Sequence, residues 1–127
     1  MKTHYTVALA MFAGVGIGAV AVHGLHAQAK PPVYYISEIE TTNPDAYVKN
    51  YAPQAQAVIK AHGGRILAAG QGTAVEGEPP KWRVVVQVWD SMDQIQAWRN
   101  SAEFKKVREI GNTYAKFRAF TVEGASQ

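Results

Sequence analysis

The run WRVVVQVW at residues 82–89 constrains the fold of this chain more than any other feature. Its three successive valines stand between aromatic residues and leave both alternating faces apolar, which is typical of a strand inside a sheet. The segments 33–40, 65–70 and 116–123 are also predicted to be strands. Glycine and proline at residues 71–81 predict a long hairpin loop, with a brief strand extension at 73–76.

Two helices are predicted between these strands. The first begins with Asn43 as its cap, followed by Pro44 and Asp45, and contains Pro53, which removes one backbone hydrogen bond and predicts a kink. The second begins after Ser91 and is interrupted near Ser101. The apolar residues at helical spacing, predicted to face the core, are Ala46, Tyr47, Tyr51, Ala55, Val58 and Ile59, then Met92, Ile95, Trp98, Phe104, Val107 and Ile110.

The order strand, helix, strand, strand, helix, strand predicts an α+β fold of the ferredoxin-like, split βαβ type. In this plan two helices cover one face of a four-stranded antiparallel sheet and leave the other face open. The alternating pattern does not say which residues face the helices. Trp82, Val84, Val86 and Val88 form the more apolar set of residues 82–89, but Trp89 on the other set is an equally credible core residue. We expect a second copy of the chain to cover the open face. The residues that could lie on this open face are Tyr34, Tyr35, Val85, Trp89 and Phe120.

The N-terminal residues 1–29 have the composition of an export signal. Lys2 is followed by an apolar stretch, and the small-x-small sequence that ends at Ala29 predicts cleavage after that residue. The alternative is an uncleaved anchor helix, since residues 6–22 approach the length that crosses a bilayer. In both cases the domain at residues 33–124 is expected in the periplasm, and the membrane is a partner only through an uncleaved N-terminal segment.

Composition excludes several classes of function. The chain has 127 residues, enough for one domain, and its net charge of +3 comes without a basic run, so we expect no nucleic-acid partner. It has no cysteine, and His62 is the only imidazole after residue 29. A metal site needs three or four convergent ligands, so no metal and no cofactor is expected.

The motifs TNPDAY, AHGGRILAAG and VVVQVWDSMDQIQAWRNSAEFKKVR, in this order, resemble a bacterial family known as domain of unknown function 1330. The resemblance covers residues 34–124 and implies a dimeric α/β barrel, a fold shared with cofactor-free monooxygenases and heme-handling enzymes. The chain departs from the family pattern at Val88, usually acidic, at Trp89, usually phenylalanine, and at Phe104, usually tyrosine. The family pattern falls on Tyr47, His62, Gly63, Gly64, Arg65, Glu76, Gly77, Arg83, Ser91, Trp98, Ser101 and Arg108.

The candidate site residues divide between the two ends of the predicted sheet. His62 could act as a general base, but a histidine in the last turn of a helix is favoured in its charged form, and we interpret it first as part of a helix end with Gly63 and Gly64. The arginines could clamp an anion, or pair and stack within the structure. Tyr47 and Trp98 are interpreted as core. The ligand-binding candidates are His62, Arg65, Arg83, Arg108, Trp89 and Tyr35.

Three functions are weighed. The first is a homodimer that binds a small apolar or weakly anionic molecule, with cofactor-independent monooxygenase-like chemistry as a less favoured extension. The second is a dimerisation or interaction module without catalysis. A pocket of about 300 Å³ lined by arginine and histidine would favour the first, and an interior filled by aromatic side chains the second. The third, an RNA-binding sheet, is disfavoured because residues 82–89 lack the glycine-aromatic pattern of such strands.

Overall fold

The computed structural model describes residues 30–126. Residues Pro31–Gln127 form a compact unit of their own. The predicted export signal or anchor, residues 1–29, lies outside the described residues. Within the described part of the chain, no helix has the length and apolar character needed to cross a membrane.

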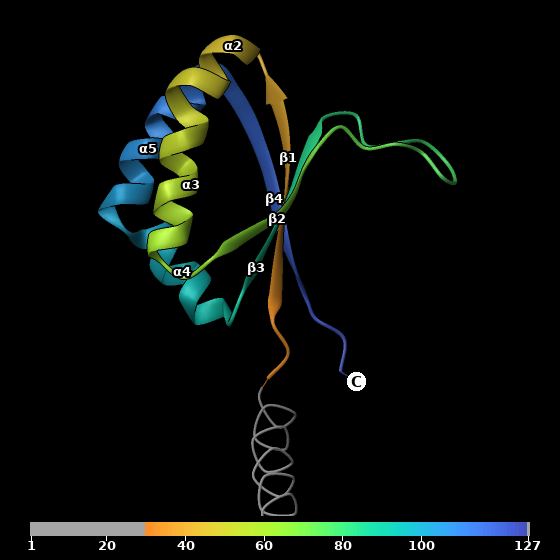
Figure 1. Cartoon of the computed structure of the whole chain (residues 1–127), viewed down its shortest axis with the longest axis vertical. Helices are drawn as coiled ribbons and strands as arrows, with labels where there is room; N and C mark the ends of the chain where they lie inside the picture. Colours follow the sequence, from red (N-terminus) through yellow and green to blue (C-terminus); the bar gives the residue numbers. More distant parts are fainter. Residues whose placement is uncertain (1–29, 127) are drawn as a thin grey trace, which may run out of the picture. The chain divides into compact units, whose positions relative to one another are not determined.

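Four antiparallel strands form one sheet in the order β2-β3-β1-β4. They are β1 (Val33–Thr41), β2 (Arg65–Gly70), β3 (Arg83–Trp89) and β4 (Ala115–Glu123). The prediction of a central β3 and of a ferredoxin-like α+β fold is confirmed (Figure 1). The predicted strand extension at 73–76 is wrong, because residues 71–82 contain no strand. Pro79 and Pro80, shortly before β3, have no amide hydrogen to donate to a paired strand.

The first helical segment follows its sequence signals closely. It consists of α2 (Pro44–Ala46), the π-helical turn η1 (Tyr47–Tyr51) and α3 (Ala52–Ala61). The side chain of Asn43 accepts a hydrogen bond from the Ala46 amide at 3.2 Å, as expected of the cap. The defect predicted at Pro53 takes the form of the wide turn that precedes it, in which the Ala52 amide donates to the carbonyl of Tyr47.

The second helical segment is divided where the sequence predicts. Ser101 ends α4 (Met92–Asn100) and caps α5 (Ala102–Tyr114), accepting a hydrogen bond from the Phe104 amide at 3.1 Å. Ser91 caps α4 through the Gln94 amide. Of the residues predicted to face the core from this segment, Met92 is 41% exposed, because it stands in the first turn, whereas Trp98 is buried.

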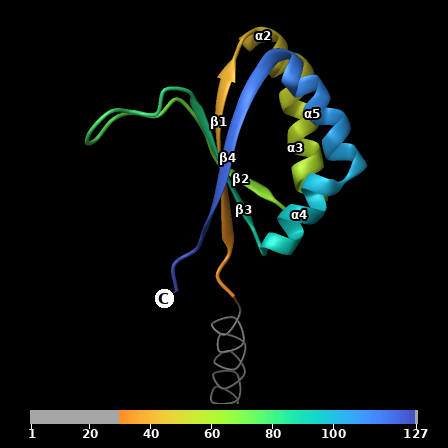
Figure 2. The same ribbon diagram turned by 180° about the vertical axis from the view of Figure 1, so that it is seen from behind.

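All helices of residues 30–126 lie on one face of the sheet, and within these residues the other face is open (Figures 1 and 2). In β1 the odd-numbered residues from Val33 to Ile39 are buried. Tyr35 pairs with Gln87 in β3, and both belong to the buried set. Tyr35, Val85 and Trp89 therefore do not lie on the open face. They pack in the two core clusters beneath the helices.

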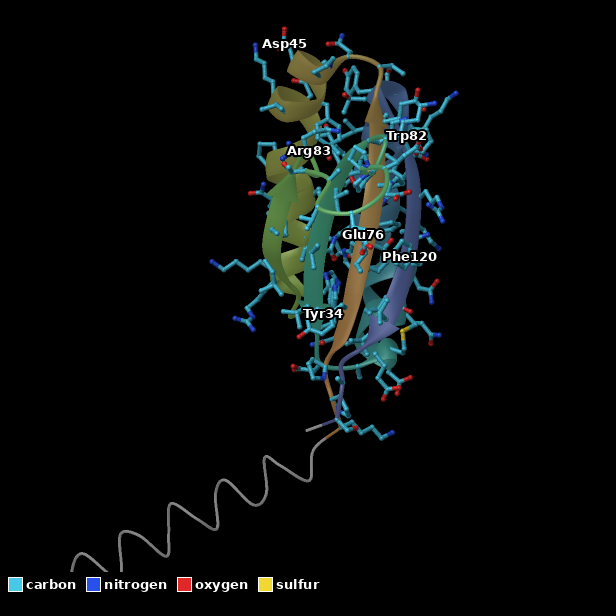
Figure 3. All side chains as sticks on the ribbon, turned by 90° about the vertical axis from the view of Figure 1, so that its right-hand side faces the viewer. Tyr34, Asp45, Glu76, Trp82, Arg83 and Phe120 are labelled. Carbon is cyan, nitrogen blue, oxygen red and sulfur yellow. The ribbon has the colours of Figure 1, made fainter. Side chains whose placement is uncertain are left out.

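The open face carries the other alternating set. Tyr34 and Phe120 belong to this set, as predicted for the open face. Figure 3 is viewed onto this face. Phe120 and Val122 of β4 are 42% and 49% exposed. Glu38 and Arg118 form an ion pair across β1 and β4. Apolar residues thus occupy much of a sheet face that no helix covers.

Candidate functional site

A cleft of about 80 Å³ lies between the sheet and the helices. Its sheet side is formed by all four strands, and its helix side by η1, α3, α4 and α5. Aromatic and aliphatic side chains form much of the lining. The polar and charged members are Ser37, Tyr47, Tyr51, Gln56, Arg83, Gln87 and Arg108.

Two tyrosines of η1 supply hydroxyl groups to the cleft. Tyr47 and Tyr51 are both buried, and their ring centroids are 5.2 Å apart. Burial, together with the neighbouring Tyr51, raises the pKa of Tyr47 to about 12, although Arg83 and Arg108 act in the opposite direction. Burial also raises the pKa of Tyr51. Both phenols therefore keep their protons at neutral pH and can donate hydrogen bonds.

Arg108 brings a cation into this apolar interior. Its guanidinium carbon lies 3.9 Å from the ring centroid of Phe117 and 4.9 Å from that of Phe104. Both distances are within the range of cation–π contacts. The Nε–H of Arg108 is buried and has no hydrogen-bond partner in the protein. The same holds for the indole Nε1–H of Trp98, whose ring packs on Phe104 at 4.8 Å.

The sequence AHGGR forms a helix end, as its first interpretation predicts. His62 caps α3, and its Nδ1 donates to the carbonyl of Val58 at 2.9 Å. Gly63 has φ +93°, the left-handed conformation that ends helices. His62 does not line the cleft.

The six candidate residues do not gather in one place. Arg83 and Arg108 line the cleft. The Tyr35 hydroxyl accepts a hydrogen bond from Arg99 at 3.1 Å, and Trp89 Nε1 donates to Gln87 at 2.9 Å, so both polar groups have protein partners. Arg65 is exposed at the opposite end of the sheet from Arg83.

Arg65 borders a wider hollow of about 430 Å³ along the edge of β2. Its volume is above the about 300 Å³ expected of a ligand pocket, but only six residues bound it and it lies open to solvent. The cleft between sheet and helices is smaller and more enclosed. We take the cleft as the candidate site, because enclosure is what strengthens polar contacts to a ligand.

Sequence reasoning missed several polar residues of the cleft. Ser37 and Gln87 are polar residues that alternate with buried apolar and aromatic residues along one face of β1 and β3, and both are buried. That pattern was the available signal, since a polar side chain on a buried strand face needs a partner. Tyr47 and Trp98 are buried, as predicted for core residues, and in addition they line the cleft.

The described residues offer no metal centre: nowhere among them do three His, Cys, Asp or Glu side chains come together as ligands. The carboxylate of Glu38 lies on the open face of the sheet, where it pairs with Arg118. Among the described residues that line the cleft there is no carboxylate and no imidazole. The described lining supplies hydroxyl, amide and indole groups and two guanidinium cations.

Similar folds occur among solved structures. SnoaB, a cofactor-independent oxygenase from Streptomyces nogalater, superposes with a TM-score of 0.58 at 11% identity, over 76% of this chain and 96% of SnoaB. The RPA0582 protein of unknown function from Rhodopseudomonas palustris gives 0.56 at 14% identity, over 84% of this chain and 93% of that one. A conserved protein from Methanosarcina mazei Go1 gives 0.52 at 10% identity, over 79% and 99%. At these identities the likeness shows the fold alone.

The sequence comparisons place the chain in a family. Curated proteins give no match. The family model described as domain of unknown function (DUF1330) matches residues 32–125, nearly all of the described part of the chain. This protein therefore belongs to the DUF1330 family and has a ferredoxin-like fold.

Proposed function

We propose that this protein is an exported homodimer that binds a small molecule with an apolar body and a weakly anionic oxygen in the cleft between sheet and helices. The observation that carries the proposal is the pair of unpartnered N–H groups, Trp98 Nε1 and Arg108 Nε, on two side chains that line the cleft. A buried donor without a partner costs about 1–3 kcal/mol. A ligand oxygen that accepts from these groups would recover that cost.

The charges of the cleft favour an anion over a cation. Arg83 and Arg108 are the charged residues of the lining, and the guanidinium of Arg108 rests on two aromatic rings. The phenol of Tyr47 keeps its proton at neutral pH, because its pKa is about 12, and so it donates to a ligand rather than repels it. A carboxylate or phenolate suits such donors.

The size of the cleft limits what enters it. About 80 Å³ is enough for several waters or for the polar end of a ligand, and falls below the 300 Å³ of a drug-sized pocket. We therefore propose a ligand no larger than a single ring in the enclosed part. The cofactor-independent oxygenase SnoaB shares the fold, but the proposal here is binding, which the hydrogen-bond donors among the described lining residues support.

The homodimer forms through the open sheet face in this proposal. Burial of exposed apolar side chains such as Phe120 and Val122 against a second sheet would remove them from water. Export rests on the composition of residues 1–29, with the periplasm as the destination.

The second candidate, a dimerisation module that holds no ligand, is favoured by the small volume of the cleft and by the aromatic rings around it. Benzoate separates the two candidates, because it combines one apolar ring with a carboxylate. Titration of the protein with benzoate, followed by calorimetry, is expected to show saturable binding at the cleft and weaker binding of the neutral benzyl alcohol.

Variants assign such binding to the cleft. Arg108→Gln is expected to raise the dissociation constant for benzoate by about tenfold, since it removes a charge-assisted hydrogen bond. Trp98→Phe keeps a ring and removes the second donor. Arg99→Gln is the matched control, because Arg99 also stacks on Phe104, at 4.6 Å, but does not line the cleft. Equal affinity for benzoate and benzyl alcohol, or equal effects of the two arginine variants, would contradict the proposal.

A further inference from the structure

Residues 71–82, here called the arm, connect β2 to β3 and project from the sheet. Figures 1 and 2 show that the arm leaves on the side opposite the helices, and Figure 3 shows Glu76 in front of the sheet on its open face. Val75, in the outer part of the arm, is fully exposed. We propose that the arm of each subunit clasps the second copy in the homodimer, an inference that rests on the dimer proposed above.

The arm has features of a preformed structure. A Cβ on Gly72 would lie 2.7 Å from Cδ of Pro80, so the outgoing and returning limbs are in close contact. Gly77 turns the chain with φ +71°. Two adjacent prolines, Pro79 and Pro80, restrict the returning limb. A projecting segment that is already ordered loses little entropy when it docks.

The arm is long enough to contact the second subunit of the proposed dimer. Two limbs of about six residues each can reach about 20 Å at 3.3 Å per residue, whereas sheets packed face to face are about 10 Å apart. A second sheet on the open face therefore lies beside the arm, and the outer part of the arm extends past that sheet. Val75 then contacts the other subunit rather than water.

The charged residues of the arm also favour a second copy of the chain as its partner. The outer part of the arm carries Glu76 and Glu78, both exposed. A two-fold axis between the sheets and parallel to the strands brings these residues opposite Lys116 and Arg118 at the start of β4 in the second copy. An axis perpendicular to the strands brings them opposite Arg65 of the second copy. The register of the sheet places all three basic residues on the open-face set.

The dissociation constant of the dimer tests the clasp. The full chain, including residues 1–29, is expressed, and the protein is purified in the processed form that the cell produces. Analytical ultracentrifugation then gives the dissociation constant of the dimer. Val75→Asp is expected to raise the dissociation constant by about tenfold or more, because it places a charge where an apolar contact forms. Val48→Asp is the matched control, since Val48 is also an exposed valine, 63% accessible, but belongs to η1 on the helix side of the sheet.

Charge reversal identifies the contact. The double variant Glu76→Lys, Glu78→Lys is expected to weaken the dimer, and a further Lys116→Glu or Arg65→Glu to restore it, according to the axis. A dimeric wild type whose dissociation constant stays within about twofold in Val75→Asp and in the double variant would overturn the clasp and leave the dimer standing. A monomeric wild type would overturn both.

Discussion

Trp89 lies so close to Gly64 that a methyl group on Gly64 would stand 2.5 Å from Cζ2 of the indole. Gly64 is therefore required by packing. Gly64→Ala is expected to destabilise the protein by about 1–3 kcal/mol, as overpacking does. Trp89→Phe removes the atoms in conflict, so the alanine should cost much less in that background. Urea unfolding of the wild type, the two single variants and the double variant measures the coupling, and additive effects would contradict this packing conflict.

The pH dependence of stability should report the buried phenol of Tyr47. Its pKa is about 12 in the folded protein and about 10 when unfolded, so the folded state holds the proton more tightly. The tighter binding of this proton contributes to the free energy of unfolding. The contribution is fully present below pH 10 and is lost as the pH rises from 10 to 12. The melting temperature of the wild type should fall more steeply across that window than that of Tyr47→Phe. Parallel curves would be inconsistent with a raised pKa.

A charge on the open face should separate the subunits. Phe120→Glu is expected to yield a monomer, because a buried unpaired carboxylate is costly. Met92→Glu is the matched control, since Met92 is exposed to nearly the same extent, 41% against 42%, and belongs to α4 on the helix side. Size-exclusion chromatography with light scattering gives the mass of each. If Phe120→Glu remains dimeric, the dimer does not use this face.

Ser101 makes two hydrogen bonds at the junction of α4 and α5. Its hydroxyl donates to the Trp98 carbonyl at 2.6 Å and accepts from the Phe104 amide at 3.1 Å. Ser101→Ala should cost about 1 kcal/mol or more of stability, as for other helix caps. Ser91→Ala loses one cap bond, to Gln94, and should cost less. Thermal unfolding compares the two, and the reverse order would be unexpected.

Local signals predict the order of the elements well. Asn43, Ser91 and Ser101 each cap a helix as the sequence indicates, because capping depends on residues within one turn. Gly63 as a helix stop is likewise local. The need for glycine at position 64 is not a local feature, because it depends on contact with Trp89, which lies in β3, a distant part of the chain.

The faces of the strands could not be predicted in the same way. Tyr34 and Tyr35 are the same residue type, and in β3 three valines lie on one alternating set whereas Trp89 lies on the other with Gln87, so hydrophobicity does not identify the buried set. The cleft shares this difficulty, since Arg83, Arg108 and Tyr47 meet there from three different elements. Their proximity results from tertiary packing, which spacing in the sequence does not encode.

Native mass spectrometry tests the central claim most directly, with the chain expressed together with its own N-terminal segment. We expect a mass of two subunits that each begin at Lys30, together with a small molecule that is released on denaturation. A monomer that carries nothing would contradict both the shared sheet face and the occupied cleft.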